Sequence, residues 1–367
     1  MKLENFKLKR IDRYIIKQFL GTFAFTIVLM IAVTVVFDIN EKIEHFLKPT
    51  VTVYEIAFHY YFNFIPYFIG LFSPLFTFIA VIFFTSKMAS HTEIIAILSG
   101  GVSYRRFMRP YIIGSTMLAL LSFFLINWVI PNSNAIRFEF DEKYYHSNPY
   151  QNRERNIHRQ IHPNLYIYMQ SYSTLSHIGN RFSLERFEDG LLKEKFVSDY
   201  IKWDTTLQKW SIMNYYYRQF DSTGERLTTG HRLDTLLPNF DKSDFSSRSE
   251  IVEAMNYGQL KKEIAKYKLS GSAAFVLFEL ERQKRFAYPF SSIILAVIGV
   301  CVSSQKKRGG IGINIGIGLA LAFSYLLFQQ VATVFSINAG FNPYLSVWIP
   351  NILYAFIAFF FYKKAAR

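Results

Sequence analysis

The sequence has almost no cysteine and lacks the short motifs of nucleotide and metal chemistry. Its single cysteine, Cys301, allows no intramolecular disulfide and is expected to be a small apolar side chain within an apolar stretch. No Gly-Lys dipeptide occurs, which excludes a phosphate-binding P-loop, and GxGxxG, HExxH and GxSxG are also missing. His158 and His162 are four residues apart, but their polar segment is expected to be irregular and has no third ligand at metal spacing.

These absences predict that the chain is not itself an enzyme. No catalytic residue, no metal site and no cofactor bound by the chain are expected. Any energy input would therefore come from another protein.

Apolar runs, by contrast, are abundant. Hydrophobic residues make up 51% of the 367 residues and 38 are phenylalanine, which is more apolar surface than one soluble core of this size usually buries. Five uncharged stretches, at about 18–37, 56–86, 110–136, 286–305 and 309–362, are long enough for roughly 20 helical residues to cross a bilayer. The last can cross twice, because turn-forming residues lie at 338–343. The sequence therefore predicts a membrane α-helical bundle of six transmembrane helices.

Basic residues outnumber acidic ones, and their placement predicts a topology. The formal net charge is +14. Lys and Arg precede the first span, separate the second from the third and the fourth from the fifth, and end the chain, so the positive-inside rule places these ends in the cytoplasm. We expect both termini to be cytoplasmic and the basic balance to reflect topology, with no nucleic-acid partner. A cleaved signal peptide is not expected, because the first apolar run is too long for one.

Residues 132–270 have a mixed composition that predicts an extracytoplasmic all-β domain, either a sandwich or an open barrel. Strand-like runs at 165–169, 196–203 and 210–220 are separated by turn residues at 189–190, 205–208 and 222–224, and 257–267 is expected to be a polar helix. The predicted organisation is three spans in 1–131, the β domain in 132–270 and three spans in 271–367.

Proline and glycine within the spans predict irregular helices. Pro66 and Pro74 would kink the second span, and a kinked helix can line a cavity. Five glycines at the start of the fifth span would let it approach a neighbour closely, either for tight packing or as a moving gate.

A short amphipathic stretch, at about 90–106, lies between the second and third spans on the predicted cytoplasmic side. Ile94, Ile97 and Leu98 would share one face of a short helix that can dock in the groove of a soluble partner. Glu93 would fix the register through a bidentate charge pair, although a solvated Glu93 on a membrane-surface helix is the alternative. The predicted coupling residues are Glu93, Ile94, Ile97, Leu98, Gly100 and Arg105.

Motifs along the whole chain carry a family resemblance. They are Ile-Asp-Arg-Tyr-Ile at 11–15, Glu-Ile-Ile-Ala-Ile-Leu-Ser-Gly-Gly-Val-Ser at 93–103, Trp-Val-Ile-Pro at 128–131 where the third span is expected to end, Glu-x-x-x-Arg-x-x-x-Pro at 281–289, and Asn-Pro…Trp-x-Pro-Asn at 342–351. Each motif is weak alone. In this order, with a β domain between two sets of three helices, they resemble the lipopolysaccharide-export permeases of the LptF/LptG family, and 11–15 is slightly LptG-like.

The resemblance implies a permease subunit of an inner-membrane ABC transporter that extracts lipopolysaccharide and passes it to a periplasmic bridge. Its outer domain would be a periplasmic β-jellyroll-like domain. Its partners would be a cytoplasmic ABC ATPase dimer that uses ATP and magnesium, a second LptF/LptG-type permease and a bridge protein of the LptC/LptA type. Glu93 matches the family's acidic residue that contacts an arginine of the ATPase.

Lipopolysaccharide carries phosphates, so cations on the periplasmic side are candidate contacts, although ion pairs with nearby glutamates explain most of them equally well. Arg285 is the first candidate because it also lies in a family motif, and the others are Arg282, Lys42, Lys48 and Arg137. Asp38 and Tyr67 stand where the best-known LptG pattern has lysines, which leaves the choice between LptF and LptG open.

Two other functions remain open from the sequence. A mechanotransmitting ABC membrane subunit would share the coupling segment without itself moving lipid. A membrane-anchored enzyme acting on envelope glycans would need an active outer domain, which the missing motifs do not support.

Overall fold

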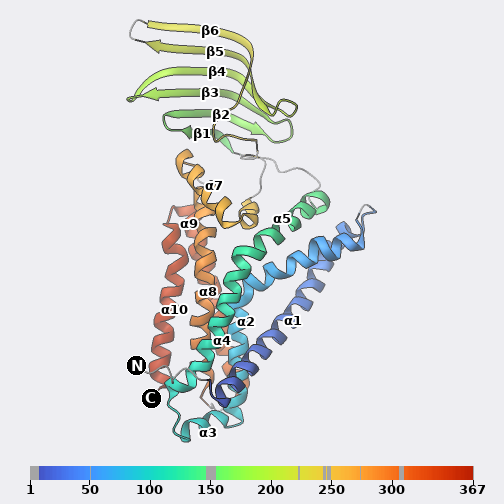
Figure 1. The fold of residues 1–367 in the computed structure, drawn as a ribbon, viewed down its shortest axis with the longest axis vertical. Helices are drawn as coiled ribbons and strands as arrows, with labels where there is room; N and C mark the ends of the chain where they lie inside the picture. The colour runs from blue at the N-terminus through green and yellow to red at the C-terminus, as the bar shows by residue number, and fades with distance from the viewer. Residues whose placement is uncertain are drawn as a thin grey trace. The chain divides into compact units, whose positions relative to one another are not determined.

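The chain forms two compact units. The computed structural model describes residues 8–49, 51–145, 154–221, 224–242, 245, 249–272, 274–305 and 310–366. One unit, Met1–Phe140 with Glu279–Arg367, is helical, and the other, Asp141–Phe278, carries a β-sheet (Figure 1). Among the described residues, six helices are long and apolar enough to cross a membrane, which confirms the predicted number.

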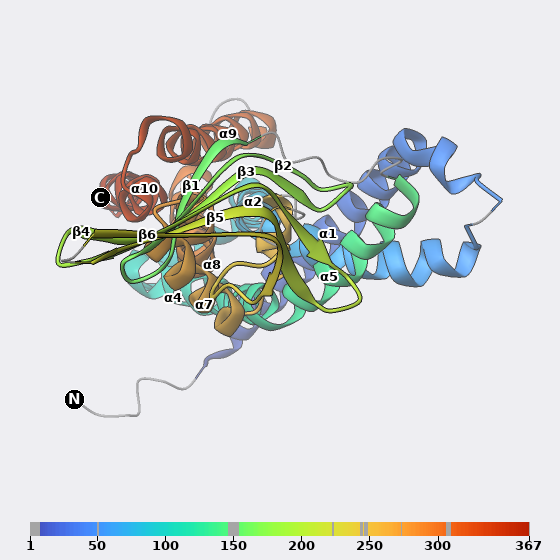
Figure 2. The same ribbon diagram turned by 90° about the horizontal axis from the view of Figure 1, so that it is seen from above.

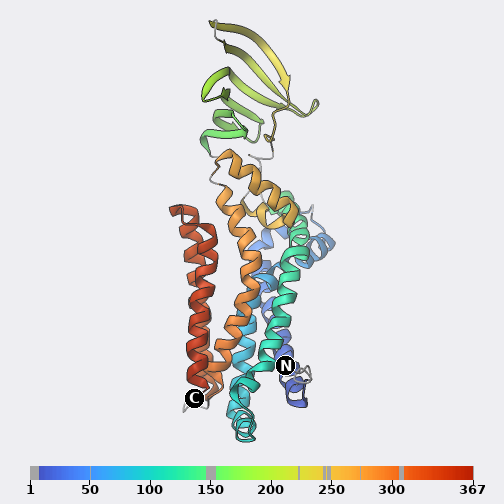
Figure 3. The same cartoon turned by 60° about the vertical axis from the view of Figure 1, so that its left-hand side comes forward.

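The helical unit is built around α2. Its elements are α1 (Arg10–Phe46), the π-helical η2 (Glu55–Tyr61), α2 (Phe62–Ser90), α3 (Glu93–Ser99), α4 (Tyr104–Phe124), the π-helical η3 (Leu125–Val129), α5 (Ile130–Phe140), α8 (Phe275–Ser303), α9 (Gly310–Ala339) and α10 (Pro343–Ala365). Within this unit α1, the first part of α2 and α5 lean together away from α9 and α10 (Figures 1 and 2). The α9 and α10 helices pack side by side (Figure 3), joined at the predicted turn, where Asn342 caps α10.

Two apolar clusters share α2. Phe19 of α1 and Phe76 of α2 belong to one, and Phe78 of α2 and Leu295 of α8 belong to the other. The predicted close approach of the fifth span occurs at Gly318 of α9, where an added Cβ would lie 2.0 Å from Ile82 Cδ1. This glycine therefore serves tight packing of α9 on α2.

The third span does not end at Pro131 as predicted, because the helix continues through α5. A proline inside an α-helix removes one backbone hydrogen bond, which is why the sequence favoured a helix end there. The preceding turn is instead the wider η3, where the Asn127 side chain donates to the carbonyl of Phe123. This local π-helical register accommodates the proline without ending the helix.

The inserted β domain is confirmed as one antiparallel sheet. Its strands are β1 (Arg155–His162), β2 (Leu165–Ser173), β3 (Ile178–Glu188), β4 (Leu191–Asp204), β5 (Lys209–Asp221) and β6 (Gly224–Thr235), and each pairs with the next in sequence (Figure 1). The described strands form one sheet, whereas a sandwich would have two packed sheets. Phe240 and Phe245, which follow β6, cover the apolar face of this sheet where a sandwich would have its second sheet. The described segment ends with a 3-10 turn, η5 (Ser249–Ala254), and α7 (Tyr257–Ser270).

The strand-like runs predicted at 165–169, 196–203 and 210–220 lie in β2, β4 and β5. The segment that forms β1 was expected to be irregular. The alternation of apolar and polar residues in β1 is not visible in the sequence, because its buried face carries the charged Arg159 between Ile157 and Ile161. Arg159 is buried under the Phe245 ring at 4.6 Å and pairs with Glu154 at 3.1 Å, which lets a charge occupy a core position. The prediction missed β3 and β6, and the β6 residues are largely exposed, so they show no apolar alternation.

Local signals set the turns and the last helix. Asp189 and Gly190 have φ values of 49° and 79°, the left-handed pair of a type I′ hairpin turn. Asn256 and Gln259 form a reciprocal capping box, with both hydrogen bonds at 2.9 Å, which begins α7. The predicted turn at 222–224 lies largely outside the described residues.

Candidate functional site

The coupling segment is a single short helix, α3, held between α2 and α4. Thr92 precedes it with a left-handed φ of 61°, a conformation that a β-branched residue adopts only when surrounding contacts impose it. Those contacts come from Ile94, which is 1% exposed, and from Ile97 and Leu98, which pack against the same core cluster. This apolar face therefore fixes α3 to its own chain.

The outward surface of α3 differs from the predicted one. Ile95 is 51% exposed, and it was not among the predicted residues because it lies off the Ile94–Ile97–Leu98 face. Gly100 ends the helix and is exposed, as is Arg105 at the start of α4. Of the predicted coupling residues, Glu93, Gly100 and Arg105 are thus open to a partner, and Ile95 joins them.

Glu93 is oriented by its own chain and remains accessible. One carboxylate oxygen accepts a hydrogen bond from the Tyr14 hydroxyl of α1 at 3.3 Å, and the other lies 3.8 Å from His91 Nδ1. The side chain keeps 37% of its surface exposed. A carboxylate held by such contacts still has lone pairs that can accept hydrogen bonds from an arginine of a partner protein.

A charge pair that the sequence analysis missed fastens the other end of this segment. Arg106 at the start of α4 donates through both terminal nitrogens to Asp12 of α1, at 2.6 and 2.5 Å. Asp12 is 3% exposed and also accepts from the Lys9 backbone N–H at 2.8 Å. The first two turns of α1 therefore contact the segment at Glu93 and at Arg106. In the sequence, an aspartate at the start of an apolar span was the one feature that pointed to such a charge pair.

The candidate cations do not form one cluster. Arg282 pairs with Glu279 at 2.6 Å and donates to Tyr344 at 2.5 Å, while Arg285, only 1% exposed, pairs with Glu281 at 2.9 Å. The local ion pairs left open by the sequence are therefore present at α8.

Lys42, Lys48 and Arg137 lie elsewhere. Lys42 pairs with Asp38 at 3.5 Å and lies over the Tyr60 ring, and Lys48 is half-buried after α1. Arg137 of α5 is 8% exposed and stacks over the Tyr67 ring at 4.4 Å.

The positions that depart from the LptG pattern each have a cation beside them. Asp38 accepts hydrogen bonds from Tyr60 and Tyr61 in addition to pairing with Lys42. Tyr67 carries Arg137 on its ring. Positive charge is therefore present near both positions, on different residues.

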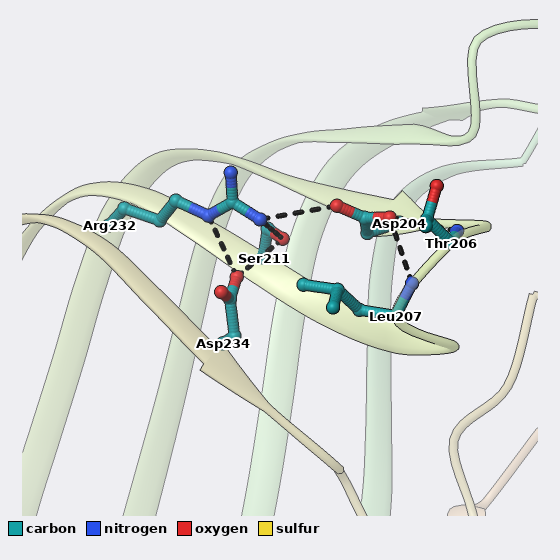
Figure 4. Close-up of polar contacts among 6 residues, drawn as sticks. All are labelled: Asp204, Thr206, Leu207, Ser211, Arg232 and Asp234. Atoms are coloured by element: carbon teal, nitrogen blue, oxygen red, sulfur yellow. Dashed lines mark hydrogen bonds and ion pairs between the residues drawn. The ribbon is translucent and has the colours of Figure 1, made fainter.

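The β-sheet unit carries an exposed charge cluster on β4, β5 and β6 (Figure 4). Arg232 Nε lies 2.9 Å from Asp234, and its Nη2 lies 3.1 Å from Asp204. The Ser211 hydroxyl donates to Asp234 at 2.6 Å and, with Arg232, holds the pKa of Asp234 below its usual value. The backbone N–H of Leu207 is the main cause of the lowered pKa of Asp204.

This cluster predicts acid sensitivity of the sheet. Because the folded-state pKa values of Asp204 and Asp234 are lowered, their stabilisation is complete above the unfolded pKa of about 3.9 and is lost as the pH falls through the folded values. Thermal unfolding of the full chain between neutral pH and about pH 3 should show Asp234→Asn with a shallower loss of stability than wild type. Identical slopes would contradict the assignment.

The described residues contain no group of three His, Cys, Asp or Glu placed to hold a metal ion. His158 and His162 lie on the exposed face of β1, and His158 packs on the Tyr168 ring.

Comparison with known proteins assigns the chain to a family. A comparison with curated proteins finds no match. A family model described as lipopolysaccharide export system permease LptF/LptG matches residues 13–364, which includes both halves of the helical unit and the whole inserted sheet. The chain therefore belongs to the LptF/LptG family of lipopolysaccharide export permeases, transport subunits of an ABC system, and is a multi-pass inner-membrane protein.

Proposed function

We propose that the chain is one of two paired permeases that extract lipopolysaccharide from the inner membrane, driven by an ATPase dimer that grips α3. The observation that carries this proposal is the surface of α3: an oriented, accessible Glu93 beside an exposed Ile95, on a helix whose other face is buried in the bundle. A force applied to such a helix is transmitted to α1, α2 and α4 because they pack against it.

The arrangement of the helix ends supports a cytoplasmic position for α3. The Tyr14–Glu93 and Asp12–Arg106 contacts bring the start of α1 to this segment, and the Tyr104 and Tyr362 rings, 6.0 Å apart, bring the end of α10 there. Basic residues of three helices, α1 with its N-cap, α4 and α10, gather at this end of the helical unit: Lys9, Arg13, Arg105, Arg109, Lys363 and Lys364. This gathering is what the positive-inside rule requires of a cytoplasmic face, so we place both termini there and the sheet in the periplasm.

Arg137 is the cation best placed to contact a lipid phosphate. It is nearly buried, stacks on Tyr67, and has no carboxylate partner among the described residues. Arg285 and Arg282 are already paired with glutamates, so their charge is largely neutralised. Burying a cation without a counterion lowers the stability of the fold unless an anion from a bound ligand pairs with it.

The sheet unit would receive the lipid and pass it to a bridge protein of the LptC/LptA type. It contains a cavity of about 610 Å³ lined by Trp203, Trp210 and Leu236 together with Lys262 of α7. Lys266, Asp241 and Glu263 also line it, so its charges balance, and its aromatic and aliphatic walls suit the apolar part of an amphiphile.

Glu93→Ala tests whether the ATPase binds α3 through this carboxylate. We expect the affinity of the assembled permease pair for the ATPase to fall at least tenfold, about 1.4 kcal/mol, because a charge-assisted contact is lost at an interface. Binding of the purified ATPase to permease in lipid nanodiscs and lipopolysaccharide-stimulated ATP hydrolysis would measure it. Glu44→Ala, an exposed glutamate on α1, is the matched control. Unchanged binding and hydrolysis in Glu93→Ala would remove the proposal.

A further inference from the structure

A second cavity of the β-sheet unit opens on the face of the sheet that lies away from its core. It has a volume of about 630 Å³ and is lined by residues of β2, β3, β4 and β5, among them Tyr168, Ser183, Val197 and Tyr216. These four residues are direct neighbours across the strands. At least one chain neighbour of each belongs to the core cluster or packs against it, so the row lies on the outer face.

The two ends of this row are aromatic and its middle is small. Neighbouring strands are about 4.8 Å apart, which separates Tyr168 on β2 from Tyr216 on β5 by about 14 Å. Ser183 and Val197 lie between them, and their short side chains leave a trough between the two rings. The Tyr168 hydroxyl donates to Asn156 at 3.1 Å, which holds that ring in place, and Tyr216 is 54% exposed.

A break in the alternation of the sheet places polar side chains beside this trough. Met169 and Tyr172 of β2 are both buried although they are three residues apart, so the residues between them are directed to the outer face. The next three strands shift in step, as shown by the buried or partly buried pairs Gly179 and Phe182, Ser198 and Ile201, and Ile212 and Tyr215. At this row Arg181 and Asn214 have left-handed φ values of 50° and 49°, a conformation that is retained where the surrounding structure imposes it and that is common at binding sites.

The polar row offers both donors and acceptors, with balanced charge. Its exposed members that line the cavity are Gln170, Asn180, Arg181 and Asp199. Arg181 and Asp199 carry opposite charges. The other charged residue of the lining, Lys195, pairs with Glu185 at 2.9 Å. A lining without excess charge does not favour a phosphate or another strongly charged group.

This combination of groups favours a saccharide. The faces of the tyrosine rings are negative and attract the polarised C–H bonds of a pyranose ring. Its hydroxyls both donate and accept, as do the side-chain amides of Gln170 and Asn180. Val197, 38% exposed in the floor of the trough, provides an apolar contact for a methyl group. An acetamido substituent carries such a methyl group beside an amide, so an N-acetylated sugar matches the trough better than a plain hexose.

We propose that this trough binds an N-acetylated glycan strand of the kind that forms a bacterial cell wall, with the sugar rings lying between Tyr168 and Tyr216. Binding there would attach the sheet unit to the cell wall. Access to such a glycan rests on the periplasmic position of the sheet given under the proposed function. The binding itself requires neither the ATPase nor lipid transport.

Two trisaccharides test the site in the purified full-length chain in lipid nanodiscs. Triacetylchitotriose and cellotriose share the same linkage and differ in the acetamido group, which is a hydroxyl in cellotriose. Isothermal titration should show wild type binding triacetylchitotriose about tenfold more tightly than cellotriose. Tyr216→Ala should weaken that binding about tenfold, because a ring face is lost. Tyr257→Ala, which removes a tyrosine 44% exposed on α7 and outside the cavity, should bind as wild type.

A third probe separates this glycan from the saccharide of the exported lipid. Deacylated lipopolysaccharide keeps its phosphates, and tighter binding of this probe than of triacetylchitotriose would overturn the proposal. Equal affinity of wild type for the two trisaccharides, binding of neither, or unchanged binding in Tyr216→Ala would also overturn it.

Thermal unfolding checks that the variant is folded. Tyr216→Ala should unfold close to the wild-type temperature, because the side chain is largely exposed. Gln170→Ala, exposed on β2, is the second variant and should lose most of the preference for the acetamido sugar, so a retained preference would contradict the proposal even if Tyr216→Ala were unstable. Failure here would leave the Glu93 result untouched, and failure of Glu93→Ala would leave this binding result untouched.

Discussion

Asp12→Ala is expected to destabilise the helical unit by about 2–3 kcal/mol and to weaken the coupling of ATP hydrolysis to lipid export. The substitution leaves the Arg106 guanidinium without the carboxylate that accepts both of its hydrogen bonds. Breaking a buried ion pair costs about 3–5 kcal/mol, and the 25% exposure of the Arg106 side chain reduces that cost. Without this pair, α4 keeps its apolar packing on α1 but loses its charged contact with the first turn of α1, so movement of α3 would no longer be transmitted in full.

A double-mutant cycle measures this contact. Asp12→Ala and Arg106→Ala should be strongly non-additive in thermal unfolding, with an interaction energy of about 1–3 kcal/mol. Arg109→Ala, an exposed arginine one turn further along α4, is the control for loss of positive charge. Additive losses would show that the two residues act independently. A wild-type ratio of lipid exported to ATP hydrolysed in Asp12→Ala would show that the pair only stabilises the fold.

Trp210→Ala is expected to have the largest effect on the sheet unit, a loss of about 3–5 kcal/mol. Trp210 is fully buried at the centre of the core face, between Trp203 and Phe240, with ring centroids 5.2 and 5.0 Å away. Its indole N–H donates to the Phe240 carbonyl at 3.1 Å, so the substitution also leaves that carbonyl unpaired. The segment after β6 would then lose one of its attachments to the sheet, while the Asn239 hydrogen bond to the Ile161 carbonyl remains.

Hydrogen exchange of the full chain, followed by mass spectrometry, would locate the damage. Trp210→Ala should raise exchange in β4, β5 and the segment at 236–242, while the helical unit keeps its protection. Tyr216→Ala, on the same strand with 54% of the side chain exposed, should change exchange little. Similar exchange in the two variants would contradict the assignment of Trp210 as the centre of this core.

Parts of the candidate site could be predicted because their signal is local. Glu93 begins a short amphipathic helix between two apolar runs, and a family motif covers it. The orientation of that helix could not be predicted, because the same periodicity describes an apolar face directed at a partner or at the chain's own core. Contacts of Ile94 within the bundle decided it.

By itself the sequence determined the six spans, the inserted β domain, the turn at Asp189 and Gly190, and the capped start of α7, because hydrophobic runs, positive-φ residues and capping side chains act over a few neighbours. Only the tertiary structure decided the pairing of Asp12 with Arg106, 94 residues apart, and the packing of Ile94 into the chain's own bundle. These features depend on which distant surfaces meet when the helices pack, and no local pattern of residues specifies that meeting.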